Sequence, residues 1–173
     1  MKTIVVTGPE STGKTVISSF LAENLGWPWI PEFARDYVSG LDRPYNYSDL
    51  VLIAENQIAQ RVEAEKNSVS FLILDTWLII TKVWFLEVFN TCPDWLDSEI
   101  SKHKIDLFLI CKPDIPWVPD PLRENGGEKR DYLMLRYIEE IKKTGSEYTM
   151  ISGIGDIRNN NALLLVQKHF NLK

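Results

Sequence analysis

The sequence has few cysteines and histidines, and it lacks long apolar runs and basic stripes. Its 173 residues include two cysteines, Cys92 and Cys111, and two histidines, His103 and His169. The cysteines match no metal spacing and two histidines are too few for a histidine-based zinc site, so we expect reduced thiols and surface histidines. No apolar run approaches the ~20 residues of a membrane span, which predicts no membrane partner. The net charge is −5 and no lysine- or arginine-rich stripe is present, so nucleic acid is not expected as a partner.

The composition is that of one globular domain. Hydrophobic residues make up 45% and charged residues 25%, which are ordinary values for a soluble protein. The chain is long enough to bury a substantial core and has no internal repeat, low-complexity segment or linker, so residues 1–173 are predicted to form a single domain. A strand-like run begins at Lys2 and leaves no room for a signal peptide, so we expect a cytoplasmic location.

Residues 8–15, GPESTGKT, follow the pattern G-x-x-x-x-G-K-[ST] of a phosphate-binding P-loop. The β-branched run before it, residues 2–7, has strand character. Apolar residues at helical spacing after it, up to Leu25 with Gly26 as a C-cap, predict a helix. Strand, glycine loop and helix in this order favour a nucleotide site over the alternative, a glycine-rich turn that binds nothing.

The chemistry of the P-loop follows from its residue types. The glycines let successive backbone N–H groups point into one concavity at a helix N-terminus, which attracts phosphate oxygens. Lys14 can reach the β- and γ-phosphates of ATP as a point charge, and the Thr15 hydroxyl can ligate Mg²⁺. The residues expected to bind the nucleotide are Gly8, Glu10, Ser11, Thr12, Gly13, Lys14 and Thr15.

A second apolar run, residues 69–75, ends in Asp75. Its continuously apolar second half predicts a strand buried on both faces. An aspartate at the end of such a strand is typical of a Walker B element, in which the carboxylate faces Mg²⁺ directly or through water. The alternative is an aspartate that caps a helix from Thr76 onward. The P-loop favours the metal role, with Thr15 as the second ligand.

The chain alternates strands and helices. This alternation predicts a three-layer α/β/α fold with about five parallel strands and helices on both faces of the sheet, and a ligand site at the carboxyl ends of the strands. Ser48 is expected to cap the helix at residues 49–66. The aromatic surplus at residues 77–90 exceeds one helix face, so part of it is expected to line a pocket, with core packing as the alternative. Further strands are predicted at 105–111 and 148–152, and further helices at 127–143 and 156–170.

Four prolines lie between positions 113 and 121. A long irregular loop inside a compact domain is usually functional. We expect residues 113–130 to form a lid that excludes water, with Arg123 and Arg130 stabilising a transferring phosphoryl group. The alternative for both arginines is a solvated helix start.

Three charged residues, Glu32, Arg35 and Asp36, follow the second predicted strand. They are expected at the same edge of the sheet as the P-loop. Phosphoryl transfer needs a carboxylate that orients or deprotonates the acceptor hydroxyl, which Asp36 or Glu32 can supply. The alternative is a surface cluster of salt bridges with Arg35.

Five segments, in order over nearly the whole chain, resemble the C-terminal ribosylnicotinamide kinase domain of NadR-type proteins. The most specific are EFARDYV and WVPDPLR, joined to the P-loop. The resemblance implies a fold similar to nucleoside-monophosphate kinases, with sheet order 2-3-1-4-5 and a lid. It also implies ATP-dependent phosphorylation of a small-molecule acceptor, nicotinamide riboside, to the mononucleotide. The five segments are Gly8–Thr15, Glu32–Val38, Asp75-Thr76, Trp95–Ile100 and Trp117–Arg123.

Within this resemblance, Asp36 is expected to accept the proton of the acceptor hydroxyl, and Glu32 and Arg35 to place the ribose. Trp77, Trp84 and Tyr45 are candidates to contact the cationic nicotinamide ring. In that family the Walker B aspartate is commonly followed, two positions on, by another acid, whereas this chain has Trp77 there.

Other functions stay open at the level of sequence. The chain lacks the H-x-G-H motif of an adenylyltransferase, so no dinucleotide synthesis is expected, and it lacks the N-K-x-D motif that reads guanine. The alternatives to a nicotinamide riboside kinase are a regulatory or switch ATPase without a small acceptor, a kinase of another nucleoside or nucleotide, and a non-catalytic ATP-binding module.

Overall fold

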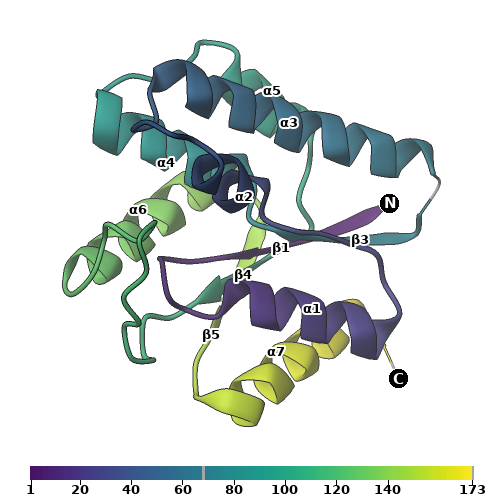
Figure 1. The fold of residues 1–173 in the computed structure, drawn as a ribbon. Helices are drawn as coiled ribbons and strands as arrows, with labels where there is room; N and C mark the ends of the chain where they lie inside the picture. The colour runs from purple at the N-terminus through teal and green to yellow at the C-terminus, as the bar shows by residue number, and fades with distance from the viewer. Residues whose placement is uncertain (68, 173) are drawn as a thin grey trace.

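A computed structural model describes residues 1–67 and 69–172, and within them five parallel strands form one sheet (Figure 1). The strand order is β2-β3-β1-β4-β5, which confirms the expected α/β fold and the 2-3-1-4-5 order. The strands are β1 Lys2–Thr7, β2 Trp29–Ile30, β3 Phe71–Asp75, β4 Leu107–Cys111 and β5 Glu147–Ile151.

The three central strands are apolar because helices cover both faces of the sheet. Their parallel register places Val6 beside Asp75 on one side of β1, and Thr7 beside Ile110 on the other. The loops that follow β1, β3 and β4 therefore leave the sheet at the same edge, which is where parallel sheets bind ligands.

Strand β2 forms one border of the sheet and is only two residues long. It pairs Trp29 with Ile73 and Ile30 with Leu74, and it lies between Pro28 and Pro31. Proline has no backbone N–H to donate, so the strand cannot extend far in either direction. The chain leaves β2 directly toward the edge that carries the P-loop.

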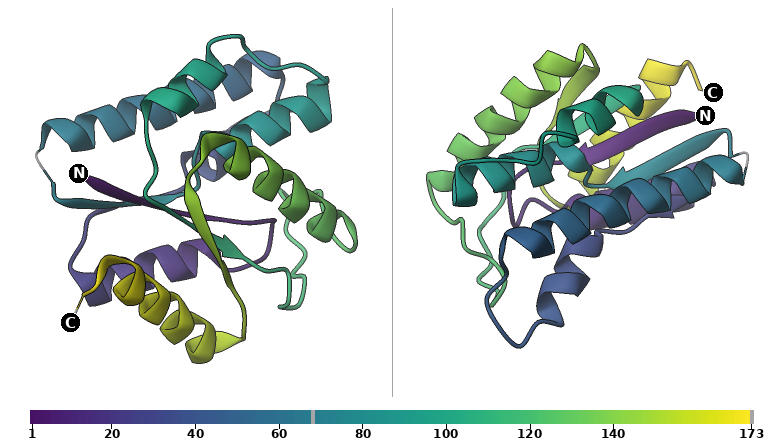
Figure 2. Two further views of the ribbon diagram at one scale, coloured as in Figure 1. Left: turned by 180° about the vertical axis from the view of Figure 1, so that it is seen from behind. Right: turned by 90° about the horizontal axis from the view of Figure 1, so that it is seen from above.

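Two layers of helices enclose the sheet. Helices α1 and α7 cover one face, and α3, α4, α5 and α6 cover the other (Figures 1 and 2). Each layer buries its own hydrophobic cluster against the strands. The helices are α1 Lys14–Leu25, α2 Phe33–Ser39, α3 Tyr47–Lys66, α4 Leu78–Phe89, α5 Leu96–Lys102, α6 Lys129–Thr144 and α7 Gly155–Phe170.

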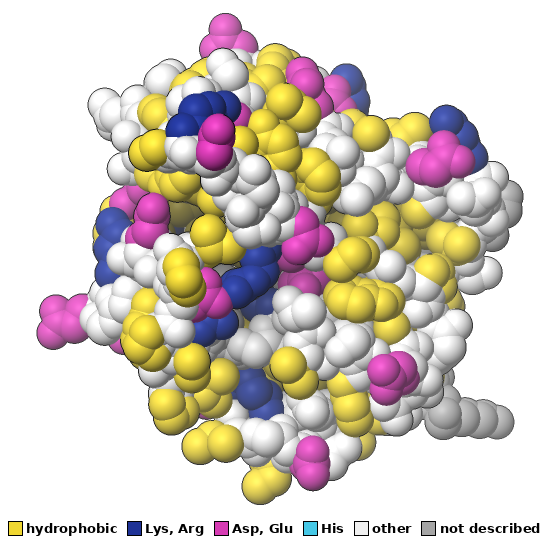
Figure 3. Space-filling model, in the orientation of Figure 1, with side chains coloured by type: hydrophobic (Ala, Val, Ile, Leu, Met, Phe, Trp, Pro, Cys, Tyr) yellow, Lys and Arg dark blue, Asp and Glu magenta, His cyan; other side chains and the backbone are white. Residues whose placement is uncertain are grey.

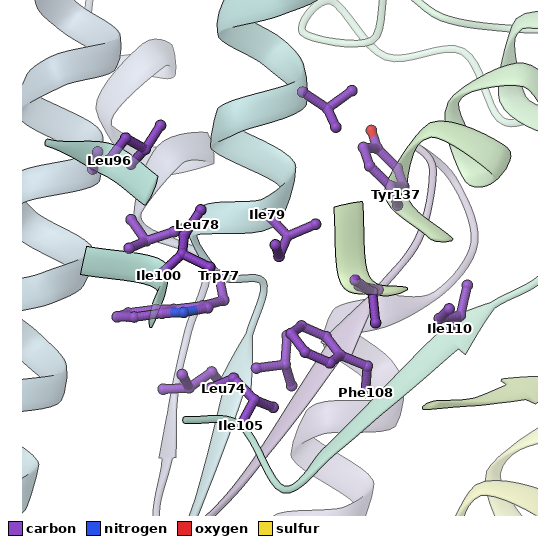
Figure 4. Close-up of a cluster of buried hydrophobic side chains, with 14 of the residues drawn as sticks. Leu74, Trp77, Leu78, Ile79, Leu96, Ile100, Ile105, Phe108, Ile110 and Tyr137 are labelled. Carbon is purple, nitrogen blue, oxygen red and sulfur yellow. The ribbon is translucent and has the colours of Figure 1, made fainter. Parts of the chain in front are cut away.

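The larger cluster absorbs much of the aromatic surplus at residues 77–90 (Figure 4). Trp77 is only 2% exposed and Phe85 is fully buried. The guanidinium carbon of Arg61 lies 5.5 Å from the centre of the Trp77 ring, a cation–π arrangement. Trp84 is half-buried and meets Tyr45 edge to face, with ring centroids 4.9 Å apart. Core packing is therefore the main role of these aromatic residues.

The start of α3 differs from the prediction. Its N-cap is Asn46 rather than Ser48, and the helix begins at Tyr47. The Asn46 side chain accepts hydrogen bonds from the backbone N–H groups of Ser48 and Asp49, while the Asp49 carboxylate accepts one from the backbone of Asn46. This reciprocal capping box satisfies more unpaired donors than a serine at position 48 can. The predicted end at residues 67–68 falls in part on Ser68, outside the described residues.

Within residues 1–67 and 69–172, none of the helices combines the length and the apolar character needed to cross a membrane.

Candidate active site

The P-loop connects β1 to α1 at the ligand edge of the sheet. Gly8 has a φ of +142°, and a Cβ at this position would lie 2.6 Å from the carbonyl oxygen of Cys111. Only glycine lets the loop pass so close to β4. Gly13, with a φ of +78°, is the N-cap of α1 and supplies no side-chain cap. The first N–H groups of α1 are thus left to an external anion, the arrangement that binds phosphate.

Lys14 and Thr12 brace the P-loop from within. The Lys14 ammonium donates a hydrogen bond of 3.0 Å to the carbonyl oxygen of Pro9, and the buried Thr12 hydroxyl donates one of 2.8 Å to the same oxygen. Thr15 is exposed at the start of α1. Thr15 therefore lies on the open side of the loop, where the sequence predicts a metal contact, whereas the half-buried Lys14 is held by the loop itself.

Asp75 ends β3 beside the P-loop. It is 2% exposed, and both of its carboxylate oxygens are buried without a hydrogen-bond partner among the described residues. The pKa of this carboxyl is raised to about 6, foremost by burial and also by the charge of Glu32, while Thr15 and Lys14 act in the opposite direction. A buried carboxylate without a donor is costly unless it is paired or coordinates a metal.

The residues at this position fit Mg²⁺. The unpartnered oxygens of Asp75 and the Thr15 hydroxyl are hard oxygen donors. In the described chain no group of three or more His, Cys, Asp and Glu residues could hold a metal. Mg²⁺ is usually bound by one or two protein oxygens, with phosphates and water completing its shell. A Mg²⁺–nucleotide complex therefore suits the donor set better than an ion held by protein alone.

The predicted lid lies across the P-loop and is attached to it by side chains that the sequence assigned to the nucleotide. The Ser11 hydroxyl accepts a 3.0 Å hydrogen bond from the Val118 backbone. The Glu10 carboxylate accepts bonds from the Asn125 backbone and side chain, at 3.0 Å and 2.9 Å. Glu10 and Ser11 can still bind phosphate through their backbone N–H groups, but their side chains hold the lid.

The two lid arginines occupy different environments. Arg123 is half-buried, and its guanidinium lies 3.4 Å from the Ser11 hydroxyl and 2.5 Å from the Val118 carbonyl oxygen. Arg130 is 5% exposed and donates to the carbonyl oxygens of Ile115 and Ser11. Burial lowers the pKa of Arg130. Neither is a freely solvated helix residue, and Arg123 is the more exposed of the two.

Arg158 of α7 was missed by the sequence analysis. It is 3% exposed and donates to the Asp114 carboxylate at 2.6 Å, and to the carbonyl oxygens of Gly153 and Lys112 at 3.0 Å and 2.8 Å. It thus ties the base of the lid to the loop after β5. Its partners are brought together by the fold, so no local pattern signals its role.

The segment after β2 provides the second half of the site. Glu32 is the half-buried N-cap residue of α2, and its charge reaches Asp75. Arg35 forms an ion pair with Asp120 of the lid. Asp36 is exposed, one turn further along α2. The structure therefore couples Glu32 to Asp75 and turns Arg35 toward the lid, while Asp36 is exposed.

A narrow crevice opens between β2, α3 and the end of β3, next to Asp75. Its walls combine apolar groups with two amides and part of Trp77. Trp77 occupies the position at which NadR-type domains commonly carry an acid, and its ring belongs to the core. Position 77 therefore offers no carboxylate to a metal. The lining residues are Ile30, Pro31, Phe33, Gln57, Gln60, Leu74, Asp75, Thr76 and Trp77.

The surface over this region is mixed in charge. In Figure 3, Lys and Arg side chains gather in a central hollow, with acidic and hydrophobic side chains around them. A positive hollow attracts a polyphosphate. The surrounding acidic groups are suited to a second ligand that is neutral or cationic.

The family of the chain follows from a family model described as an AAA domain, which matches residues 3–159. The chain belongs to this AAA domain family. Its match covers the P-loop, Asp75, the acidic segment of α2 and the lid.

Individual relatives of this AAA domain share the same architecture. The chain is 26% identical over 157 residues to the trifunctional NAD biosynthesis/regulator protein NadR of Salmonella typhimurium. This match covers 87% of the chain and 38% of the relative. The chain thus spans about two fifths of that protein. A crystal structure of NadR in complex with NR superposes with a TM-score of 0.81 at 22% identity, over 99% of this chain and 50% of that one. Thymidylate kinase from Ehrlichia chaffeensis gives a TM-score of 0.68 at 18% identity, over 98% of both chains. These structural likenesses establish the fold.

Proposed function

We propose that this AAA domain is an ATP-dependent kinase that phosphorylates nicotinamide riboside to nicotinamide mononucleotide. The observation that carries the proposal is the lid, which contacts both halves of the site. It binds the P-loop through Ser11 and Glu10, and it binds α2 through the ion pair of Asp120 with Arg35. A kinase must hold two substrates together and exclude water, whereas a hydrolytic switch needs no second pocket.

The donor side of the site, which consists of the P-loop, Asp75 and the lid arginines, would bind ATP. The backbone of the P-loop would hold the phosphates, with Lys14 and Arg123 next to the transferring group and Arg130 fixing the lid above Ser11. Thr15 and Asp75 would hold Mg²⁺, which neutralises charge on the phosphate oxygens when bound.

The acceptor side of the site, from α2 to the start of α3, favours an acceptor that carries no phosphate group. Its two arginines are already neutralised: Arg35 is paired with Asp120, and Arg43 donates to both carboxylate oxygens of Asp49 at 2.7 Å and 2.9 Å. Glu32 and Asp36 remain as acidic groups. Such a surface favours a neutral or cationic nucleoside over a nucleotide, and the likeness to NadR in complex with NR supports nicotinamide riboside.

A carboxylate near the reacting hydroxyl would orient it or accept its proton. Asp36 was the sequence-based choice and stays a prediction. Glu32 is better placed, because it is half-buried and its charge reaches Asp75. A general base must lie within hydrogen-bond reach of the proton that it takes.

The test is phosphoryl transfer from radiolabelled ATP by the purified protein. Nicotinamide riboside, thymidine, deoxyadenosine and nicotinamide mononucleotide are compared as acceptors, with a no-acceptor control. We expect labelled mononucleotide with nicotinamide riboside and little hydrolysis without it. Turnover only with another nucleoside would reject the substrate but keep the kinase. Equal phosphate release with and without every acceptor would instead identify a switch ATPase.

A further inference from the structure

Asp120 is the central residue of the lid. One carboxylate oxygen pairs with Arg35 of α2, and the other accepts a 2.9 Å hydrogen bond from the Leu122 backbone. The Asp120 carbonyl oxygen accepts the backbone N–H of Arg123 at 3.0 Å. Asp120 therefore fixes the turn that carries Arg123, and Arg35 in turn fixes Asp120.

The contacts continue from this turn to the P-loop. The Arg123 guanidinium lies 3.4 Å from the Ser11 hydroxyl, which also receives the Val118 N–H. Arg35, Asp120, Arg123 and Ser11 thus form one series of contacts from the acceptor-side helix to the donor-side loop. A second contact reinforces this arrangement, since the Tyr45 hydroxyl donates a 3.0 Å bond to the Glu124 carboxylate.

The ion pair is suited to opening and closing. The Arg35 side chain is 45% exposed and that of Asp120 is 19% exposed. Pairs this open to solvent contribute little to the stability of a fold, so stability alone gives no reason for a connection across 85 residues of chain. The backbone bond from Leu122 and the charge of Arg35 hold the pKa of Asp120 below its usual range.

We propose that Arg35 and Asp120 are positioning residues that set Arg123 over the P-loop, so that the acceptor-side helix controls the donor-side cation. This inference rests on the proposed kinase function. It assigns Arg35 a contact with the lid, in place of the ribose contact expected from the sequence. In this arrangement, acceptor binding against α2 stabilises the position of Arg123, and ATP without acceptor is turned over slowly.

Two measurements test this, and the first needs no acceptor. Trypsin cleaves after Arg123 when the lid opens, and mass spectrometry quantifies that cleavage in the intact chain with and without ATP·Mg²⁺. The variants are Arg35→Ala, Asp120→Asn, the double variant and the charge swap Arg35→Asp/Asp120→Arg. Asp120→Asn keeps an oxygen for Leu122 and loses only the charge. Lys66→Ala is the matched control, because it removes an exposed ion pair with Glu63 far from the lid.

Both single variants should raise the cleavage rate about two- to fivefold, as expected for losing one partly exposed ion pair. The double variant should be no worse than either single variant, and Lys66→Ala should match the wild type. The charge swap should restore part of the protection, because it restores the ion pair but not the acceptor for the Leu122 N–H. Thermal unfolding of each variant is measured alongside to confirm folding.

The second measurement is steady-state kinetics with nicotinamide riboside. Displacing Arg123 should lower kcat about tenfold or more with little change in the acceptor KM. Arg123→Ala should cost much less in the Asp120→Asn background than in the wild type. If Arg35→Ala raises the acceptor KM and leaves lid cleavage unchanged, Arg35 contacts the acceptor directly and the inference is wrong. If neither the wild type nor any variant transfers phosphate but the cleavage after Arg123 changes as described, the kinase proposal fails while the positioning of Arg123 stands.

Discussion

The charge of Glu32 contributes to the raised pKa of Asp75, whose main cause is burial. One carboxylate belongs to the N-terminus of α2 and the other to the end of β3. An acceptor hydroxyl next to Glu32 would therefore be close to a phosphoryl group held by the P-loop.

This relationship separates Glu32 from Asp36. Glu32→Gln keeps the size of the side chain and removes its ability to take a proton, so kcat should fall about 10²- to 10⁴-fold with ATP binding retained. Asp36→Asn, at an exposed position of the same helix, is the matched variant and should lose much less. Transfer kinetics and ATP affinity are measured for both. The opposite ranking would make Asp36 the base, as the sequence suggested.

Gly8 should tolerate no side chain. In Gly8→Ala the new methyl group would meet the Cys111 carbonyl oxygen at 2.6 Å. We expect a loss of about 1–3 kcal/mol in the free energy of unfolding from the strained backbone, together with loss of ATP binding. Urea unfolding and nucleotide titration measure the two effects.

Gly26→Ala is the control for Gly8. Gly26 also has a positive φ, of +66°, but a Cβ there meets nothing within 4 Å. It should cost about 1 kcal/mol and leave ATP binding intact. Equal losses in both variants, with ATP still bound, would contradict the role of the close approach to β4.

Asp75 should oppose folding and support nucleotide binding. Its carboxylate oxygens are buried without partners in the part of the chain that the structure describes. Asp75→Asn removes the buried charge, so we expect about 1–3 kcal/mol of added stability in the protein without ligand. The rise in Tm that ATP·Mg²⁺ gives the wild type should be lost. A less stable variant that still gains Tm from ATP·Mg²⁺ would instead indicate a structural cap.

Asp49 gives the protein a specific sensitivity to acid. Hydrogen bonds from Arg43, foremost, and from the Asn46 backbone and the Tyr37 hydroxyl hold the pKa of Asp49 well below its usual range. A lowered pKa stabilises the fold above the unfolded value of about 3.9, and this contribution is lost as the pH falls below it. The stability difference between wild type and Asp49→Asn should therefore shrink as the pH falls from about 7 to about 3.

Asp42→Asn, an exposed neighbour, is the control for the acid prediction. Its difference from the wild type should change little over the same range of pH. Urea unfolding at each pH provides the free energies, and a constant Asp49 difference would count against the network.

The sequence predicted those parts of the molecule that depend on local patterns. The P-loop, β1, β3 and the strand order were predictable because spacing, apolar runs and family resemblance all point to the same fold. The start of α3 was not, since Asn46 and Ser48 are both good cap residues and only the reciprocal bond with Asp49 decides between them.

Contacts between segments far apart in the chain could not be predicted from local sequence patterns. Glu10 and Asn125 are 115 residues apart, and Arg158 binds groups from two loops, the one after β4 and the one after β5. Trp77 could be recognised as unusual for the family, but its place in the core depends on the packing of α3 and α4 around it.

Strand β2, with only two residues between Pro28 and Pro31, also affects how molecules meet one another. A sheet border with unpaired N–H and C=O groups is a template on which another chain can add a strand. Here the border is too short and its prolines cannot donate, so this side of the sheet resists edge-to-edge aggregation. The same prolines direct the chain into α2, so the protection of the sheet and the placement of Glu32 come from one short segment.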